Sequence, residues 1–465
     1  MLDTEMETNG LKDGKIQPTI EVYRKRWIIL IIYILCSCLS TAQWIEYSII
    51  NNVVMKYYHV SATTVDWTSM SFSIMWPILV FPVSYITDKM GLRAAVFIGI
   101  LLTALGAGVK VLSVGENLFY VVLLGQVIVS ISQIFLLNLP PKLSAVWFKP
   151  EEISTVCSLG ILGMTSGTAI SYFIPPIMVR DSDNLDEIAE DLRVMCWGVF
   201  LLSIPLVLIV FFYFPERPLN PPSMAMFEER NNRNEVTIFL FAKSFELLMK
   251  NKAFHVHNVA FGCNLGIYTA IGTFLNQFVL SYFPNAQEDA GRMGSMMIIF
   301  GIGGSVLTGI FLDKTHRFKE TSFLLFLLGT LGLGGVLYAM SAQNKWLTYL
   351  AITVFGIFLS GYLPAGVEFG TEITYPSPES TVMGILYATS QIITVVLTII
   401  FGKIIAKFGA FWALTGMIIT MAVGTTLTLM TPNNLKRQKY FISKNGVEFT
   451  QLPQQDNKNY VQRIV

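Results

Sequence analysis

The stretch "SYITDKMGLR", residues 84–93, closes one apolar run of the chain and opens the next, and it has a counterpart in the second half. The counterpart is "GIFLDKTHRFK", residues 309–319, which places Asp313 225 positions after Asp88. In each copy an acid stands at the end of an apolar run and an arginine follows shortly after it. This echo indicates that the chain consists of two related halves.

Length and composition place the chain in a lipid bilayer. It has 465 residues, of which 53% are hydrophobic and only 14% are charged, and a soluble domain does not need so much apolar surface. Runs of about 18 or more apolar residues, long enough to cross a hydrocarbon core of about 30 Å, recur along it. Twelve spans are predicted, at about 27–50, 67–87, 92–113, 118–140, 153–179, 195–214, 254–283, 293–312, 321–341, 346–370, 381–402 and 408–430.

A polar, proline-bearing linker divides these spans into two sets of six. A second echo supports the division, since "WFKPEEISTVCSLGIL" at 147–162 and "YPSPESTVMGIL" at 375–386 enter the fifth and eleventh spans. Two halves related by an axis along the membrane normal are the plan of the major facilitator superfamily. We therefore expect an all-α integral membrane protein of that fold, with twelve transmembrane helices in two six-helix bundles. The expected parts are a cytoplasmic tail (1–26), a bundle (27–214), a cytoplasmic linker (215–253), a second bundle (254–430) and a disordered cytoplasmic tail (431–465).

The positive charges predict the orientation. If both ends of the chain are cytoplasmic, 24 of the 32 Lys and Arg lie on that side, where they resist translocation. All five cysteines fall within predicted spans, so we expect small buried residues rather than disulfide partners. No short apolar run with a cleavage site follows the start, so the first span is expected to be its own insertion signal.

The repeated loop suggests a conformational motif on the cytoplasmic side. Asp88, Gly91 and Arg93 fit the superfamily signature between the second and third spans, in which an acid at a helix end faces a basic residue across a tight glycine turn. The second copy keeps Asp313 and Arg317 but lacks the glycine. A solvated loop that only obeys the charge rule would explain the same residues.

Four residues at membrane depth form the candidate substrate site. Polar side chains within spans are costly and usually face a cavity, and in the superfamily arrangement the first, fourth and seventh spans line the central cavity while the eleventh flanks it. Two aromatic faces and two neutral amides suit a quaternary ammonium, because a desolvated cation–π contact is worth about 2 kcal/mol or more and the amides can bind a hydroxyl. Packing, interface anchoring or bonds between helices would explain the same residue types. The four are Trp44, Gln133, Tyr268 and Gln391.

Three further residues are candidates for cavity or gating roles. If 27–50 is one continuous helix, Tyr47 extends the wall that the candidate tryptophan forms, whereas Glu46 lies about 200° around the helix and faces another wall or a partner helix. Glu368, in the tenth span, would carry a proton, act in gating or pair with a basic group. A carboxylate substrate would need Lys or Arg at depth, and the candidate is Lys110, near the outer end of the third span.

Several functional classes have no signal in the sequence. There is no P-loop for ATP phosphates, no His-Glu-x-x-His zinc pair and no TVGYG selectivity filter. His255 and His257 lie on opposite faces of a helix, which does not suit a shared metal. No nucleophile, base and orienting group occur at a spacing that would assemble them. We therefore expect neither an enzyme nor a bound cofactor or metal.

Long strings of the sequence resemble the feline leukaemia virus subgroup C receptor-related family, a branch of the major facilitator superfamily. The resemblance covers nearly all of residues 25–430. The strings, similar in order and spacing, are "QWIEYSIINNV" at 43–53, "DWTSMSF" at 66–72, "LGQVIVSISQIFLLNLPPKLSAVWFKPEEISTVC" at 124–157, "TEITYPSPES" at 371–380 and the segment around Gln391.

This resemblance implies import of choline and ethanolamine by facilitated diffusion, across the plasma membrane, with haem export proposed for some members. The choline cage of the family has a Trp in the first span, a Gln in the fourth, a Tyr in the seventh and a Gln in the eleventh, which fall on the four candidate residues. Two positions depart from the family, with Glu46 in place of a Gln and Ser40 in place of an Asn. The added carboxylate would favour cations or introduce proton sensitivity.

Three functions follow from these patterns. The first is a uniporter for choline-like cations that alternates between outward-open and inward-open states. The second is a haem or porphyrin exporter, for which His255 and His257 would serve at the cytoplasmic mouth. The third is a non-transporting receptor or scaffold that acts through its tails. The expected partners are a small-molecule substrate and the lipid bilayer, without nucleic acid, and a monomer is expected.

Overall fold

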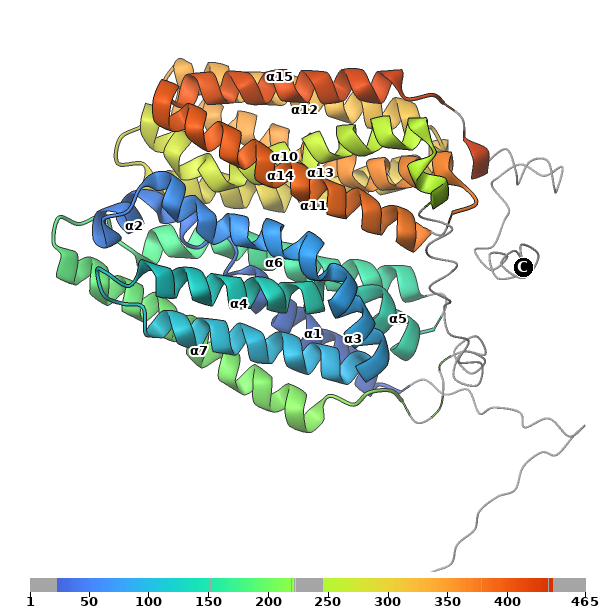
Figure 1. Cartoon of the computed structure of the whole chain (residues 1–465), viewed down its shortest axis with the longest axis horizontal. Helices are drawn as coiled ribbons and strands as arrows, with labels where there is room; N and C mark the ends of the chain where they lie inside the picture. Colours follow the sequence, from blue (N-terminus) through green and yellow to red (C-terminus); the bar gives the residue numbers. More distant parts are fainter. Residues whose placement is uncertain are drawn as a thin grey trace, which may run out of the picture. The chain divides into compact units, whose positions relative to one another are not determined.

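The computed structural model describes residues 23–149, 152–218, 220, 222, 246–377, 379–433 and 435–437, apart from the side chains of Asp88, Ser154 and Ser380. All regular secondary structure in these residues is helical, as Figure 1 shows. Most of the two expected tails and of the linker at 215–253 lies outside the described residues.

Eleven helices of the described residues are long and apolar enough to cross a membrane. Two of these, Ala62–Thr87 and Lys89–Val111, are the arms of one kinked helix, α3. The elements are α1 (Lys25–Thr41), η1 (Ser48–Ile50), α2 (Asn51–Tyr58), α3 (Ala62–Val111), α4 (Phe119–Leu137), α5 (Pro140–Trp147), α6 (Ile153–Met178), α7 (Leu185–Tyr213), α10 (Lys252–Tyr282), α11 (Gln287–Thr315), α12 (Phe318–Ser341), α13 (Lys345–Thr374), α14 (Glu379–Phe408) and α15 (Ala410–Met430). The second to twelfth predicted spans each correspond to one of the eleven.

The first predicted span is not a continuous helix, and the prediction for 27–50 is wrong in this respect. α1 ends at Thr41 after 17 residues, residues 42–47 form turns, and the chain then resumes in η1 and α2. The Thr41 hydroxyl donates to the carbonyls of Ser37 (2.8 Å) and of Met164 on α6 (2.9 Å), and such bonds from threonine to its own helix favour a bend. The N–H groups of Ala42, Gln43 and Trp44 still donate to carbonyls of the last turn of α1, and the main-chain groups beyond them need partners outside a helix.

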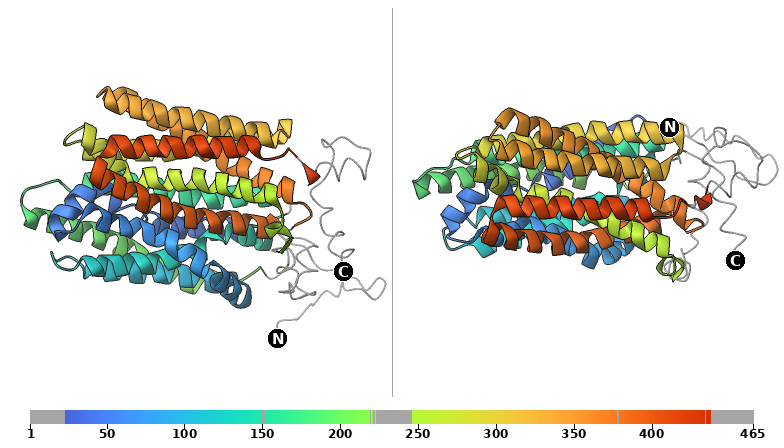
Figure 2. Two further views of the ribbon diagram at one scale, coloured as in Figure 1. Left: turned by 45° about the horizontal axis from the view of Figure 1, so that its top comes forward. Right: turned by 90° about the horizontal axis from the view of Figure 1, so that it is seen from above.

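The described residues form two compact units. The first contains residues up to 235 together with Ile271–Ile299, so the end of α10 and the start of α11 belong to it. In this unit α3 packs along α4 and α7, and α1 packs along α6. The second unit contains Val236–Ala270 and Phe300–Val465, and in it α12 packs along α13 and α15. Within each unit the long helices run side by side (Figures 1 and 2).

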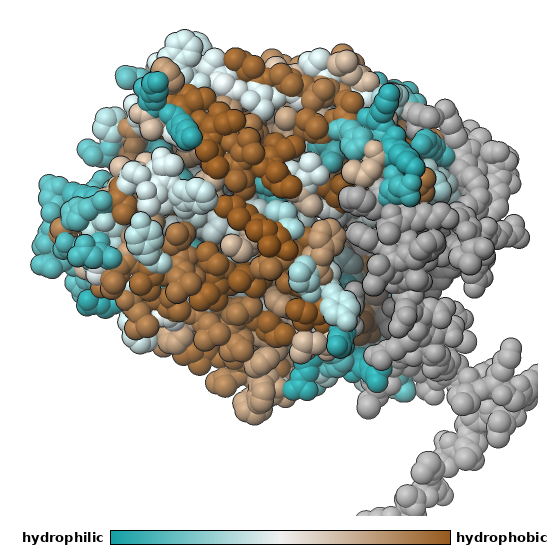
Figure 3. Space-filling model, viewed as in Figure 1, coloured by the Kyte–Doolittle hydropathy of each residue, from teal (hydrophilic) through white to brown (hydrophobic). Residues whose placement is uncertain are grey.

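Burial differs sharply between the spans and identifies the helix that the protein itself surrounds. In α7 only 22% of the most apolar window is buried, whereas in α10 83% of it is buried. Apolar side chains cover the middle of the face seen in Figure 3, and hydrophilic ones gather toward its ends, as a bilayer requires. Polar residues on α10 are therefore sheltered from lipid by neighbouring helices.

The kink in α3 is a glycine turn that is capped from the end of α7. Gly91 has φ +88° and ψ −179°, a conformation essentially restricted to glycine. The Glu216 carboxylate accepts hydrogen bonds from the main-chain N–H groups of Leu92 and Arg93, both at 2.7 Å. The Arg93 guanidinium donates to the carbonyl of Phe211 on α7 at 2.7 Å. The acid that meets this turn is thus Glu216, which the motif did not indicate, and the side chain of Asp88 lies outside the described residues.

The second copy of the motif also has a residue with positive φ at its turn, but this residue is not a glycine. His316, which aligns with Gly91, has φ +50° and precedes Arg317, the N-cap of α12. The side chains of Asp313 and Arg317 are both exposed. Only glycine adopts positive φ without strain, so this copy forms its turn at a greater local cost.

Gly91→Ala should destabilise the protein more than Gly409→Ala. Both glycines have φ +88°, so alanine is strained by about 1–3 kcal/mol at either position. A Cβ added at Gly409 meets no atom within 4 Å, whereas one added at Gly91 overlaps the Glu216 carboxylate. Thermal unfolding of the purified variants in detergent measures the difference in stability. Adding Glu216→Ala to the Gly91→Ala variant should restore part of the lost stability, because it removes the overlapping carboxylate. Equal losses for the two glycines would contradict the Glu216 cap.

Candidate functional site

The four candidate substrate residues lie in both units. Trp44 lies in the non-helical segment after α1 and Gln133 on α4, in the first unit. Tyr268 lies on α10 and Gln391 on α14, in the second unit. All four side chains are half-buried, which suits groups that line a cavity rather than a packed core. Since two residues belong to each unit, their convergence stays a prediction.

Several polar atoms near these residues are free to bind a ligand. Among the described residues, the buried Trp44 Nε1 donor and the buried Gln391 Oε1 acceptor have no hydrogen-bond partner. Buried polar atoms are nearly always satisfied in native proteins, so each exception calls for a ligand, a water molecule or another explanation. A donor at Trp44 and an acceptor at Gln391 are therefore available.

Sequence reasoning did not select Asn264, which belongs to the same region of α10. It stands one helical turn before Tyr268 and is fully buried, and within the described residues neither its Nδ2 nor its Oδ1 has a partner. The signal was present, because Asn264 is an isolated amide in the middle of the seventh predicted span.

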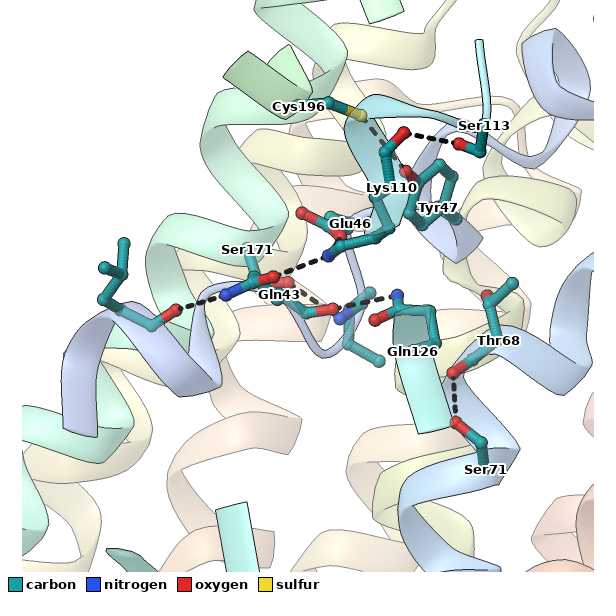
Figure 4. Close-up of polar contacts among 12 residues, drawn as sticks. Gln43, Glu46, Tyr47, Thr68, Ser71, Lys110, Ser113, Gln126, Ser171 and Cys196 are labelled. Atoms are coloured by element: carbon teal, nitrogen blue, oxygen red, sulfur yellow. Dashed lines mark hydrogen bonds and ion pairs between the residues drawn. The ribbon is translucent and has the colours of Figure 1, made fainter. Parts of the chain in front are cut away.

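A buried ion pair involves the segment that carries Trp44 and is drawn in Figure 4. Lys110, from the second arm of α3, forms an ion pair with Glu46, and the two side chains are only 2% and 4% exposed. The Lys110 ammonium also donates to Gln43 Oε1 at 2.6 Å and lies 5.8 Å from the centre of the Tyr47 ring. We call these four residues, with Gln126 of α4, the Lys110 cluster. The two charges can be buried away from both lipid and water because each compensates the other.

The main-chain groups of the interrupted span are bonded by side chains from neighbouring helices. Gln126 Nε2 donates to the carbonyl of Gln43 at 3.0 Å, and the N–H of Ile45 donates to Ser171 Oγ of α6 at 2.8 Å. At membrane depth, a non-helical backbone is tolerated only where protein or a water-filled cavity supplies such partners. The segment that carries Trp44 is therefore built into the first unit.

Two glycines make room for the lysine. A Cβ on Gly125 would lie 2.5 Å from Lys110 Cγ and 2.9 Å from the carbonyl oxygen of Gly106. A Cβ on Gly106 would meet the Val129 side chain and the carbonyl of Gly125. α3 and α4 therefore approach closely at this pair, and the Lys110 stem crosses the surface that Gly125 leaves open.

These contacts change three expectations about the first span. Glu46 does not lie 200° around a helix from Trp44, because residues 42–47 are not helical. The Tyr47 side chain is fully buried, with its hydroxyl 3.5 Å from Cys196 Sγ, so it packs inside the first unit. Lys110 is already neutralised by Glu46, which argues against a carboxylate substrate. The sequence does contain opposite charges in two separate apolar spans, at Glu46 and Lys110, but it does not show that the two residues lie close together.

The remaining candidates, Glu368, His255 and His257, belong to the second unit. The Glu368 side chain is exposed on α13 of the second unit. His257 Nε2 lies 2.7 Å from the carbonyl of Gly366, and His255 Nε2 lies 2.7 Å from the carbonyl of Met249. Within the part of the chain that the structure describes, no group of three or more His, Cys, Asp or Glu residues is placed to hold a metal ion.

Comparison with known proteins agrees with this architecture. The model of the Major Facilitator Superfamily matches residues 29–392. The choline/ethanolamine transporter flvcr2a of Danio rerio is 35% identical over 94% of this chain and 92% of its own length. The uncharacterized MFS-type transporter C09D4.1 of Caenorhabditis elegans is 38% identical over 92% of this chain and 72% of its own length. A bacterial homologue of the human lysosomal transporter Spinster has a similar fold, with a TM-score of 0.70 and 13% identity over 90% of this chain and 99% of its own.

Gly125→Ala should destabilise the first unit by about 1–3 kcal/mol, as overpacking does in a well-packed core. The added methyl group displaces the Lys110 stem and separates α3 from α4. Gly198→Ala on α7 is the matched control, because a Cβ there meets nothing within 4 Å. Thermal unfolding in detergent should show a lower midpoint for Gly125→Ala alone. A Gly125→Ala variant as stable as Gly198→Ala would contradict the close approach.

Proposed function

This chain belongs to the major facilitator superfamily and, within it, to the feline leukaemia virus subgroup C receptor-related family, and we propose that it is a uniporter for choline and ethanolamine. The observation that carries the proposal is the 35% identity to a choline/ethanolamine transporter over 94% of the chain. The two repeated halves act as two six-helix bundles, 27–214 and 254–430. They alternate between outward-open and inward-open states around one substrate site.

The chemistry of the four candidate residues supports a quaternary ammonium as substrate. Trp44 and Tyr268 offer aromatic faces, which attract a desolvated cation through the ring quadrupole. Gln133 and Gln391 are neutral amides, and the unpartnered Oε1 of Gln391 can accept a hydrogen bond from the substrate hydroxyl. None of the four carries a charge, so a cation meets neither repulsion nor a carboxylate that would hold it too tightly to release.

The Lys110 cluster supports transport without a coupling ion. A carboxylate that carries protons must be free to exchange them, and Glu46 is instead buried and paired with Lys110. The membrane potential is a sufficient driving force, since an inside-negative potential favours the entry of a monovalent cation by about 2.3 kcal/mol per 100 mV. The distribution of Lys and Arg supports cytoplasmic ends, and the family resemblance supports residence in the plasma membrane.

The alternatives receive less support from the described residues. A haem carrier would need an accessible axial ligand, but both histidine Nε2 atoms near the start of α10 already contact main-chain carbonyls. A receptor or scaffold would act through the tails, most of which lie outside the described residues. A panel of choline, ethanolamine, carnitine and haemin, measured as thermal shifts of the purified protein, separates these functions.

Trp44→Ala should reduce choline uptake about thirtyfold at low substrate concentration, because a desolvated cation–π contact is worth about 2 kcal/mol. Uptake of labelled choline by cells that express each variant, corrected for surface level, is the measurement. Trp346→Ala is a control of equal size, since this tryptophan is 83% exposed at the start of α13. Equal uptake by wild type and Trp44→Ala would remove Trp44 from the site.

Choline uptake should follow the membrane potential and no ion gradient. Depolarisation with high external potassium is expected to slow the initial rate, because the substrate carries one positive charge. Replacement of external sodium and dissipation of a proton gradient at constant potential should leave the rate unchanged. A rate that falls with either gradient would contradict uniport.

A further inference from the structure

Lys110 contacts residues that precede and follow Trp44 in the sequence. The Lys110 ammonium donates a hydrogen bond to Gln43, the residue before Trp44, and forms an ion pair with Glu46, two residues after it. It also faces the ring of Tyr47. Its partners therefore come from one short non-helical segment, and Trp44 stands between them. In Figure 4 this segment curves around the end of the Lys110 side chain.

We propose that Lys110 and Glu46 are positioning residues for substrate binding, because their ion pair holds the non-helical segment 42–47 in the conformation that presents the Trp44 ring. This proposal rests on the proposed function, in which Trp44 contacts the substrate cation. The pair itself does not touch the substrate.

Residues 42–47 need an ion pair to hold them because the helix is interrupted there. A continuous helix would fix the direction of Trp44 through a regular hydrogen-bond ladder, but residues 42–47 form turns, in which the N–H groups of Gln43 and Trp44 donate three residues back instead of four. Gln126 and Ser171 bond the main chain at Gln43 and Ile45, which fixes the path of the backbone at these points. The ion pair adds an anchor on the far side of Trp44, at Glu46. The ring is thereby fixed from both directions along the chain.

The burial of the pair makes it a strong and specific anchor. Both side chains are nearly inaccessible, so neither charge can turn toward water if the segment moves. Taking two ions out of water is costly, and good geometry between them is what compensates. A path of residues 42–47 that carried Glu46 away from Lys110 would separate the charges inside the first unit. The ion pair therefore opposes such a movement.

The pair also keeps the surroundings of Trp44 electrically neutral. A lone ammonium at Lys110 would repel a substrate cation at the neighbouring ring, and Glu46 cancels that charge. The Glu46 carboxylate thus accompanies the lysine in a site proposed to bind cations without being a ligand of the cation.

The test is the double variant Lys110→Met/Glu46→Gln, which removes both charges at once. Either single change would leave an unpaired buried charge and endanger folding. The double variant should raise the KM for choline about tenfold through misplacement of the ring, with the turnover per surface copy within about twofold of wild type. Hydrogen exchange of peptides that cover residues 42–50 should become faster, while exchange in α4 stays unchanged.

Arg180→Gln/Asp191→Asn is the matched control, because it neutralises an ion pair of the same unit at the surface, where the Nε–Oδ2 distance is 2.9 Å. Neither its KM nor its exchange should change. If the double variant of the buried pair does not fold, Gln43→Met replaces it, since this change removes one contact of Lys110 and keeps both charges. It should give a smaller rise in KM and faster exchange at 42–50.

Three results would overturn the positioning role. In the first, exchange at 42–50 is unchanged. In the second, exchange is faster but the KM for choline is that of wild type. In the third, the pair affects only the melting temperature and the surface level, as a purely structural pair would. If the wild type itself takes up no choline, the proposed function fails, and the exchange experiment alone decides whether the ion pair holds the segment.

Discussion

A bilayer offers no hydrogen bonds, and this constraint explains the arrangement around the first span. Each main-chain group that leaves the helical ladder must be bonded by the protein, and each charge must be paired. The break after Thr41 releases such groups within a few residues, and Gln126 and Ser171 supply partners for them. Lys110 and Glu46 add a buried ion pair, and a conformation of this segment that separated the two charges would be unfavourable. The irregular backbone is stable because α3, α4 and α6 all contribute side chains to it.

Close helix approaches at glycine make these contacts reachable. The Lys110 stem lies over Gly125, where α3 and α4 meet, and Gly167 of α6 leaves space for Thr41 and the carbonyl of Cys38. A third glycine, Gly91, turns the chain where Glu216 caps it. In each case an atom from another segment of the chain occupies the space that a Cβ would fill, so these glycines are packing positions as much as flexible ones. They determine which polar side chains can meet.

A neutral, aromatic site is consistent with the family and with the charges of the chain. The buried lysine has its own carboxylate, and the four candidate substrate residues carry no charge. In the proposed function, a monovalent cation enters with the membrane potential and leaves again, because no single contact holds it strongly. Glu46 departs from the family resemblance at this very place. Its partnership with Lys110 gives the departure a structural role that requires no change of substrate.

The sequence by itself determined the all-helical membrane fold and the positions of eleven of the twelve predicted spans, and it predicted two related halves. Length, hydropathy and an internal echo are properties of the chain that need no knowledge of distance. It also indicated Trp44, Gln133, Tyr268 and Gln391 as a group, through their depth in the spans and the resemblance to a family. Only the tertiary structure decided that the first span is interrupted, that Glu216 caps the Gly91 turn, and that Lys110 meets Glu46. These features depend on contacts between residues that are 64 to 126 positions apart in the chain, and a hydropathy average over neighbouring residues cannot locate such pairs.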